Sequence, residues 1–583
     1  MSSDIKEIPT KPFDGQKPGT SGLRKRVKVF EQEHYTENFV QAILDSIPAQ
    51  GGAKGATLVV GGDGRYFSVP AIQIILRIAA GNGVSKLIIG HQGILSTPAA
   101  SNIIRKYKAT GGILLTASHN PGGPNADFGI KYNVQNGGPA PENVTNSIYG
   151  RTKSITSYKV LDAPPVDLSK IGDQTYGPLK VTIIDSVADY VELLRSIFDF
   201  GLIKSFLHST PSFKVLFDGL HGVTGPYAKA ILLGELGLPR DSIQNFEPSP
   251  NFGGGHPDPN LTYAHSLVEV VEKNNIQFGA ASDGDGDRNM IYGKGAFVTP
   301  SDSVAIIADW ADSIPYFKGG VKGLARSMPT SAAIDYVAEA KGYEVFEVPT
   351  GWKFFGNLMD AGRLSICGEE SFGTGSDHIR EKDGIWAVIA WLNIIAAANQ
   401  TNKGWGINEI LLDHYQKYGR SFFSRYDYEE VSSEGAQALI DNLDKLFADP
   451  SFISSSYNAK SVSESFTVAK VTNFTYTDPI DNSVSKNQGH ILQFTDGSRV
   501  VFRLSGTGSQ GATVRFYIER YSKDPAQYER PTAEGLKGLI EVALAITKLP
   551  EFLGRSEPTV ITVSGVLSSR LVCHLCANPI YPQ

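Results

Sequence analysis

Cysteine is scarce in this chain, with 3 residues in 583, which is too few for the disulfide framework of a small secreted domain. The chain also lacks an apolar run long enough to span a membrane, since a membrane-spanning helix needs about 20 apolar residues. The longest run, IWAVIAWLNIIAAA at 385–398, is shorter and contains Asn393, so we expect a core helix there. No block of Lys and Arg occurs and the net charge is −6, which gives no support to binding of nucleic acid or membrane.

The N-terminus, MSSDIKEIPTKPFDG, lacks the apolar segment of a secretory signal. Together with the scarcity of cysteine, this predicts a cytoplasmic protein without a membrane span. Cys573 and Cys576 form a single C-x-x-C without a second pair, which is weak evidence for zinc. We expect the segment around them to be a loosely packed tail.

The length predicts roughly four domains at about 150 residues each. Three segments, 57–80, 213–237 and 322–342, each run from a β-rich apolar stretch through a turn into a helical pattern. Such βα units indicate three related α/β domains with mixed or parallel sheets. After about residue 420, β-branched and aromatic residues dominate, which favours an α+β domain with an antiparallel sheet and a helix over 532–547. The predicted domains are 1–195, 196–310, 311–420 and 421–562, followed by an atypical tail, 563–583.

A first candidate site lies in LLTASHNP, at 114–121. The preceding GGILL favours a buried strand, and the Pro and Gly residues that follow force a turn. Ligands of open α/β sheets bind beyond the carboxyl ends of strands, so Ser118 is a candidate nucleophile. A serine-rich turn that only satisfies its own backbone is the alternative.

The stretch ASDGDGDRNM, at 281–290, alternates three aspartates with glycines. Asp283, Asp285 and Asp287 repel one another unless a cation lies among them, and oxygen ligands with room for a phosphate favour Mg²⁺. A calcium-binding EF-hand loop would need Glu at its twelfth position, where this chain has Lys294. A solvated acidic turn is the alternative.

The stretch FRLSGTGSQGATVRFYIE, at 502–519, places a loop of small residues between two strands. Exposed backbone N–H groups, hydroxyls and arginines indicate a phosphate-binding cradle, although a plain glycine-rich hairpin is possible from these residues alone. In CGEESFGTGSDHIREKDG, at 367–384, Glu369 and Ser371 suit sugar hydroxyls. His378, Arg380 and Lys382 add donors there, and an exposed charged loop is the alternative reading.

Two shorter stretches fit the same scheme. GTSGLRKRV places Arg24 after a small-residue turn, and FGIKYN places Lys131 on a strand soon after the Ser118 loop. A lysine near a phosphate acts as a proton carrier or as a clamp. Either residue taken alone is also compatible with a structural role.

Taken together, these stretches resemble the α-D-phosphohexomutase superfamily, and specifically its eukaryotic-type phosphoglucomutases. The motifs that carry the resemblance, in the family's order, are GTSGLRK at 19, TASHNPGGPNADFGIKYN at 116, DGDGDRNM at 283, PTGWKFF at 349, GEESFGTGSDHIREKDG at 368 and FRLSGTGS at 502. GRSEPTVIT, at 554–562, looks like the family's usual terminus, and the tail beyond it departs from the pattern. The parafusin branch of ciliate phosphoglucomutases is a subgroup compatible with these motifs.

The resemblance implies four domains around a central cleft, three of them α/β and the fourth holding the phosphate cradle. It implies interconversion of glucose 1-phosphate and glucose 6-phosphate through a phosphoserine enzyme and a glucose 1,6-bisphosphate intermediate. Ser118 would be the phosphoserine, and one of its phosphate oxygens would hold one Mg²⁺ with the three aspartates. Lys131 or His119 would remove the hydroxyl proton, a choice that the sequence leaves open.

The other residues that the resemblance assigns to the site fall into three groups. They are Arg24 among the catalytic residues; Arg288, Thr350, Gly351, Glu369, Ser371 and Lys382 at the sugar; and Arg503, Ser505, Gly506, Thr507 and Arg515 at the non-reacting phosphate. The expected partners are small sugar phosphates, and the expected state is a monomer or weak dimer. A phosphomannomutase, a glucose-bisphosphate synthase and a phosphoglucomutase-like structural protein with little catalysis are the competing interpretations.

Overall fold

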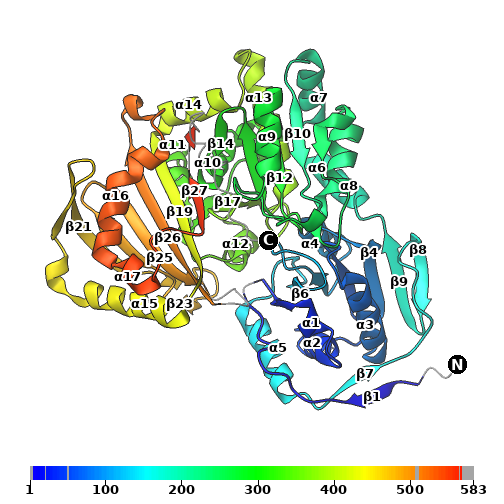
Figure 1. Cartoon of the computed structure of the whole chain (residues 1–583). Helices are drawn as coiled ribbons and strands as arrows, with labels where there is room; N and C mark the ends of the chain where they lie inside the picture. Colours follow the sequence, from blue (N-terminus) through cyan, green and yellow to red (C-terminus); the bar gives the residue numbers. More distant parts are fainter. Residues whose placement is uncertain (1–3, 20, 49–51, 506–510, 564, 567–583) are drawn as a thin grey trace.

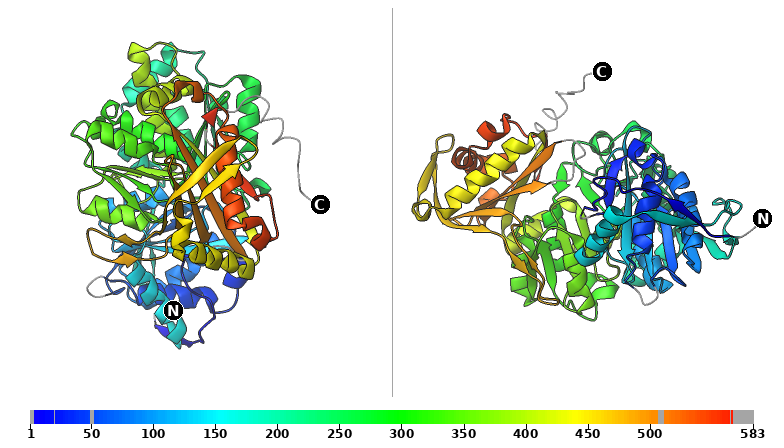
Figure 2. Two further views of the ribbon diagram at one scale, coloured as in Figure 1. Left: turned by 90° about the vertical axis from the view of Figure 1, so that its left-hand side faces the viewer. Right: turned by 90° about the horizontal axis from the view of Figure 1, so that it is seen from below.

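The computed structural model describes residues 4–19, 21–48, 52–505, 511–563 and 565–566. Four large sheets, of seven, six, four and seven strands, each form the centre of one domain. The domains follow one another along an arc, with the first and fourth at its ends (Figure 1). Viewed from below, the third domain lies between the first domain and the fourth (Figure 2).

The first domain has a mixed sheet in which four central strands are parallel and the edges are antiparallel. Its strands, in sheet order, are β2 (Leu23–Arg26), β6 (Asp127–Val134), β5 (Gly111–Leu115), β3 (Thr57–Gly62), β4 (Lys86–Ile94), β9 (Leu179–Ile184) and β8 (Gly172–Tyr176). Its helices are α1 (Val27–Phe30), α2 (Tyr35–Leu44), α3 (Ser68–Gly81), α4 (Thr97–Lys106) and α5 (Glu142–Ser154). A small ribbon of β1 (Lys6–Pro9) and β7 (Ser157–Val160) flanks it.

The second and third domains have smaller mixed sheets. The second contains β11 (Ile243–Gln244), β10 (Val215–Asp218), β12 (Phe278–Ser282), β13 (Asn289–Gly293), β14 (Ala296–Val298) and β28 (Gly565–Val566), with helices α6 (Ala188–Ile197), α7 (Phe200–Ser209), α8 (Thr224–Ala228) and α9 (His265–Asn274). The third contains β16 (Val345–Val348), β15 (Leu324–Ser327), β17 (Ile366–Glu369) and β18 (Gly373–Ser376), with helices α10 (Pro300–Asp309), α11 (Ala333–Lys341), α12 (Trp352–Asp360), α13 (Gly384–Thr401) and α14 (Ile407–Tyr418).

The same four-strand arrangement recurs in these three domains. The strand orders β6-β5-β3-β4, β13-β12-β10-β11 and β18-β17-β15-β16 each contain three parallel strands and one antiparallel strand at an end. The antiparallel strand follows the second strand of each order directly in sequence. The three related α/β domains expected from the sequence are therefore present, and equivalent loops leave β5, β12 and β17.

The fourth domain has an antiparallel sheet covered by helices. Its strands, in sheet order, are β20 (Ser456–Ala459), β21 (Glu464–Asn473), β24 (His490–Phe494), β25 (Arg499–Ser505), β26 (Ala512–Ser522), β19 (Arg420–Val431) and β27 (Val560–Val563). Helices α15 (Ser433–Ala448), α16 (Thr532–Thr547) and α17 (Leu549–Leu553) pack on it through a separate hydrophobic core. A two-stranded ribbon, β22 (Tyr476–Thr477) with β23 (Val484–Ser485), accompanies the sheet. The helix expected over 532–547 is α16.

The apolar run at 385–398 and the start of the C-terminal tail both lie in regular secondary structure. The run at 385–398 lies within α13, which has 18 residues and is the one helix of the described chain that is long and apolar enough to cross a membrane. Because 78% of that window is buried inside the protein, α13 is a core helix. Beyond Thr562, β28 pairs with β14 of the second domain, so that part of the tail does belong to a sheet. Cys573 and Cys576 lie outside the described residues.

Candidate active site

The Ser118 loop leaves β5 in a conformation that its neighbours enforce. Ser118 has φ 53°, which is uncommon for a residue other than glycine and marks local strain. Its backbone N–H donates to Thr116 Oγ1 at 2.7 Å, and the Thr116 hydroxyl donates to Asp63 at 2.7 Å. These bonds hold the loop and leave the Ser118 hydroxyl to donate to Asp283 Oδ2 at 2.9 Å. The turn therefore does more than satisfy its own backbone.

Arg65, which follows β3, holds this loop through hydrogen bonds to its backbone. Its guanidinium pairs with Asp63 at 2.8 Å, and both side chains are fully buried. The remaining donors reach the backbone carbonyls of Ser118 at 2.9 Å, Asn120 at 3.3 Å and Asp127 at 2.9 Å. One buried cation thus holds the backbone of Ser118 and of the turn that follows it, a support that was not predicted from the sequence.

The three aspartates leave β12 and converge. Oxygens of Asp283, Asp285 and Asp287 all lie within 4.8 Å of one another, and all three residues are buried, so a solvated acidic turn is excluded. Burial and the charges of the two neighbours raise the pKa of Asp283 well above its ordinary value. One buried oxygen of Asp285 and one of Asp287 have no hydrogen-bond partner. Unpaired buried carboxylate oxygens fit a bound divalent cation, which oxygen ligands of this kind suit.

Glycines allow the loop that carries the three aspartates (the metal loop, 283–288) to lie against the Ser118 loop (the serine loop, 116–121). A Cβ on Gly284 would lie 2.6 Å from the carbonyl oxygen of Ser118, closer than real side chains approach. Gly286 has φ +83°, in the left-handed region that glycine tolerates best. Both positions therefore require glycine for the serine hydroxyl to reach Asp283.

Lys131 and Lys382 meet the same centre from two domains. Lys131, on β6, forms an ion pair with Glu381, which also accepts from Asn133 at 2.8 Å. Lys382 lies 3.2 Å from Asp287. Burial raises the pKa of the Glu381 carboxyl, while Lys131 opposes that shift. Glu381 was not predicted, although it directly precedes Lys382 in the quoted REKDG motif.

His119, the next residue in the chain, lies beside the Ser118 hydroxyl. Its Nδ1 lies 3.3 Å from Ser118 Oγ. Burial, followed by the charges of Arg288 and Arg24, lowers the pKa of His119 well below its ordinary value. The imidazole of His119 is therefore less readily protonated than an ordinary histidine.

The loop after β17 carries Glu369 and Ser371, which were expected to contact the sugar. Glu369 accepts from the backbone N–H of Gly351 at 2.9 Å, and burial raises the pKa of its carboxyl. The segment 367–384 is buried almost throughout, so the exposed charged loop is excluded. His378 and Arg380 were expected to add donors, but they bind Asp383 and Asp360 of the framework instead.

The residues expected to form a phosphate cradle lie in the fourth domain. Arg503 on β25 and Arg515 on β26 are directly opposite each other in the antiparallel register. Arg515 lies 3.8 Å from Asp427, and Arg503 donates to the carbonyl of Gln488 at 3.1 Å. Ser505 ends β25, and Gly506 and Thr507 lie outside the described residues.

These elements enclose a cavity of about 320 Å³ that residues of all four domains line. The predicted residues that line it are Arg24, Ser118, His119, Lys131, Asp287, Arg288, Thr350, Gly351, Glu369, Ser371, Lys382, Arg503 and Arg515. Asp283 and Asp285 lie buried beside it. Lining residues that the sequence analysis missed include Lys17, Ser21, Lys25, Trp352 and Glu381. Lys25 and Trp352 belong to the GTSGLRK and PTGWKFF motifs, and this position in the motifs could have identified them from the sequence.

Comparison with known proteins covers almost the entire chain. Models of the phosphoglucomutase/phosphomannomutase α/β/α domains I, II and III match residues 15–159, 188–295 and 299–418, and a model of the phosphoglucomutase-1 C-terminal domain matches 420–559. The chain is 60% identical to a phosphoglucomutase of Schizosaccharomyces pombe over 560 residues, which is 96% of this chain and 100% of the relative. It is 56% identical to human phosphoglucomutase-1, with the same coverage.

Solved structures of related proteins have the same fold as this chain. The open form of the exocytosis-sensitive phosphoprotein parafusin, a phosphoglucomutase from Paramecium, superposes with a TM-score of 0.86 at 48% identity, covering 96% of this chain and 99% of that one. A phosphomannomutase-like structure from Thermus thermophilus, at 22% identity and a TM-score of 0.64, shares the fold, with 93% of this chain and all of that one covered.

Proposed function

Because the chain belongs to the phosphoglucomutase/phosphomannomutase family, we propose that it interconverts glucose 1-phosphate and glucose 6-phosphate through a phosphorylated Ser118. The observation that carries this proposal is the 2.9 Å hydrogen bond from the Ser118 hydroxyl to Asp283, beside a cavity lined by basic side chains. Phosphoryl transfer requires positioning and charge stabilisation more than covalent chemistry by the protein. The bond that Arg65 donates to the Ser118 carbonyl and the bond that the Ser118 N–H donates to Thr116 supply the positioning.

One Mg²⁺ ion is the proposed cofactor, held by Asp283, Asp285, Asp287 and a phosphate oxygen on Ser118. When bound, the ion supplies charge neutralisation for the transferring phosphoryl group. The unpaired oxygens of Asp285 and Asp287 support this assignment. Lys382, at 3.2 Å from Asp287, would hold that carboxylate in place.

Phosphorylated Ser118 would donate its phosphoryl group to the free hydroxyl of the bound sugar, and glucose 1,6-bisphosphate would form. Lys131, as the free amine, or His119 would take the hydroxyl proton, and the Ser118 oxygen would gain a proton as its bond to phosphorus breaks. His119 lies beside the serine, whereas Lys131 is ion-paired with Glu381 and is also suited to clamp the phosphoryl oxygens. Arg24 lines the same end of the cavity and would add positive charge there.

The bisphosphate must turn over before its other phosphate faces Ser118. Arg503 and Arg515, with Ser505, Gly506 and Thr507, would grip the phosphate that is not reacting. Glu369 and Ser371, with Arg288, Thr350 and Gly351, would contact the sugar hydroxyls. The serine is rephosphorylated when the isomeric monophosphate leaves. We further propose that the protein acts in the cytoplasm, as a monomer or weak dimer.

The test is glucose 1-phosphate conversion with Mg²⁺ and a trace of glucose 1,6-bisphosphate, comparing the unmodified protein with Ser118→Ala. We expect fast turnover that the substitution abolishes and that a chelator stops. Mannose 1-phosphate, assayed in parallel, should turn over more slowly. Absence of turnover in the folded, unmodified protein would overturn the proposal and favour a structural or binding role.

A further inference from the structure

A buried ion pair joins the phosphate cradle to the third domain. Arg499 and Glu519 are directly opposite each other on β25 and β26, four residues from the opposed pair Arg503 and Arg515. Residues four apart on a strand share a face of the sheet and lie about 13 Å apart. The face that presents the cradle arginines to the cavity therefore also carries this ion pair.

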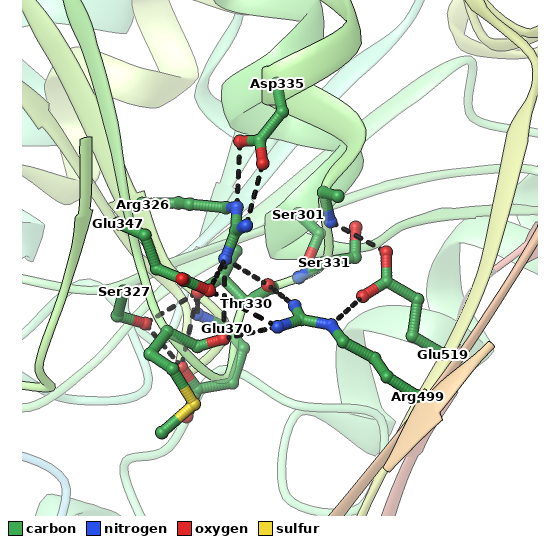
Figure 3. Close-up of polar contacts among 12 residues, drawn as sticks. Ser301, Arg326, Ser327, Thr330, Ser331, Asp335, Glu347, Glu370, Arg499 and Glu519 are labelled. Atoms are coloured by element: carbon green, nitrogen blue, oxygen red, sulfur yellow. Dashed lines mark hydrogen bonds and ion pairs between the residues drawn. The ribbon is translucent and has the colours of Figure 1, made fainter. Parts of the chain in front are cut away.

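Arg499 uses its entire guanidinium at the domain boundary. Its Nε donates to Glu519 at 2.6 Å, and its two terminal nitrogens donate to the backbone carbonyls of Met328 at 3.1 Å and Thr330 at 2.6 Å (Figure 3). Glu519 in turn accepts from the backbone N–H of Ala332 at 2.7 Å. Both side chains are buried, so the domains meet through charge-assisted bonds out of water.

On the other side of the boundary, the same loop reaches the sugar-binding segment. Thr330 Oγ1 accepts from the backbone N–H of Glu370 at 2.9 Å, and the Glu370 carboxylate accepts from Ser327 at 3.0 Å (Figure 3). Glu370 lies between Glu369 and Ser371, which line the cavity. One residue, Thr330, is thus held by the cradle domain through its carbonyl and holds the sugar loop through its hydroxyl.

Arg326 makes the third-domain side of this contact rigid. It pairs with Asp335 at 2.7 Å and Glu347 at 2.9 Å and also donates to the carbonyl of Thr330 at 3.3 Å. The loop 328–332 is therefore also held by contacts within its own domain. A rigid loop transmits the position of the fourth domain instead of absorbing it.

We propose that Arg499 and Glu519 are positioning residues that set the distance between the cradle arginines and the sugar-binding loop. The inference rests on the proposed function of the cavity. A sugar phosphate must touch both parts at once, so its affinity depends on their separation. Inorganic phosphate touches only one part at a time, at the cradle or beside position 118, so its affinity does not depend on that separation.

Binding of these two ligands separates the possibilities. Calorimetry with Mg²⁺ would compare glucose 1-phosphate and inorganic phosphate in a Ser118→Ala background, where turnover is blocked. For Arg499→Lys, whose single ammonium cannot replace the fork, we expect the Kd of glucose 1-phosphate to rise roughly ten-fold, in line with the cost of small misplacements. The Kd of phosphate should stay unchanged.

Glu519→Gln, which keeps the shape of the side chain, should shift the two Kd values in the same unequal way and serves if Arg499→Lys does not fold. Arg520→Lys is the matched control, because Arg520 pairs with Glu464 inside the fourth domain, and it should leave both Kd values unchanged. Equal weakening of both ligands, or no change in a folded variant, would overturn the inference. If the protein with Ser118 intact lacked turnover while the unequal Kd shifts were observed, the result would count against the proposed function alone.

Discussion

Arg65→Met tests whether the support of the serine loop is as costly to remove as the contacts indicate. The substitution leaves Asp63 as a buried carboxylate without its cation and leaves the carbonyls of Ser118, Asn120 and Asp127 without their donor. Removing one partner of a buried ion pair costs about 4 kcal/mol. For a domain of this size that corresponds to a fall in Tm of about 10 °C.

Thermal unfolding and initial rates of glucose 1-phosphate conversion would be measured together. Asp63→Asn combined with Arg65→Met removes the stranded charge, so we expect it to recover part of the Tm but not kcat, because the serine loop still lacks its anchor. Arg77→Met is the control, since Arg77 pairs with Asp162 on the surface of the same domain, where ion pairs contribute little. An unchanged Tm and kcat in Arg65→Met, or full recovery of kcat in the double variant, would refute the reasoning.

Three further predictions follow from other contacts. Glu381→Gln leaves the Lys131 ammonium without its buried partner, so we expect initial rates to show a fall in kcat of about ten-fold or more, and an unchanged kcat would contradict the proposed role of this pair. Gly284→Ala pushes the metal loop away from Ser118 and should weaken Mg²⁺ activation, whereas Gly356→Ala, in open space on α12, should not. Burial lowers the pKa of His414 to about 4, below its ordinary value of 6.5, so the unfolded chain binds the proton first. Stability should therefore fall by about 3 kcal/mol as the pH drops from 6.5 to 4, and urea unfolding of His414→Gln should lack that part of the loss.

Much of the site was predictable because its chemistry is local in sequence. DGDGDR brings three carboxylates together within one loop, and glycine is the residue type that such a tight loop demands. TASHNP ends a strand and begins a turn, so Ser118 had to lie at a strand end. The recurring βα pattern predicted three related α/β domains, and the resemblance to phosphoglucomutases supplied their order around a cleft.

The supporting contacts could not be predicted from the sequence, because their partners lie far apart along the chain. Glu381 is 250 residues from Lys131, and Arg499 is 169 residues from Thr330. His378 and Arg380 have side chains suited to binding a sugar phosphate, but in the structure they pair with Asp383 and Asp360 instead. Composition and spacing determined which groups the chain offers. The tertiary structure decided which of them face one another, since burial and long-range pairing select partners that no local pattern specifies.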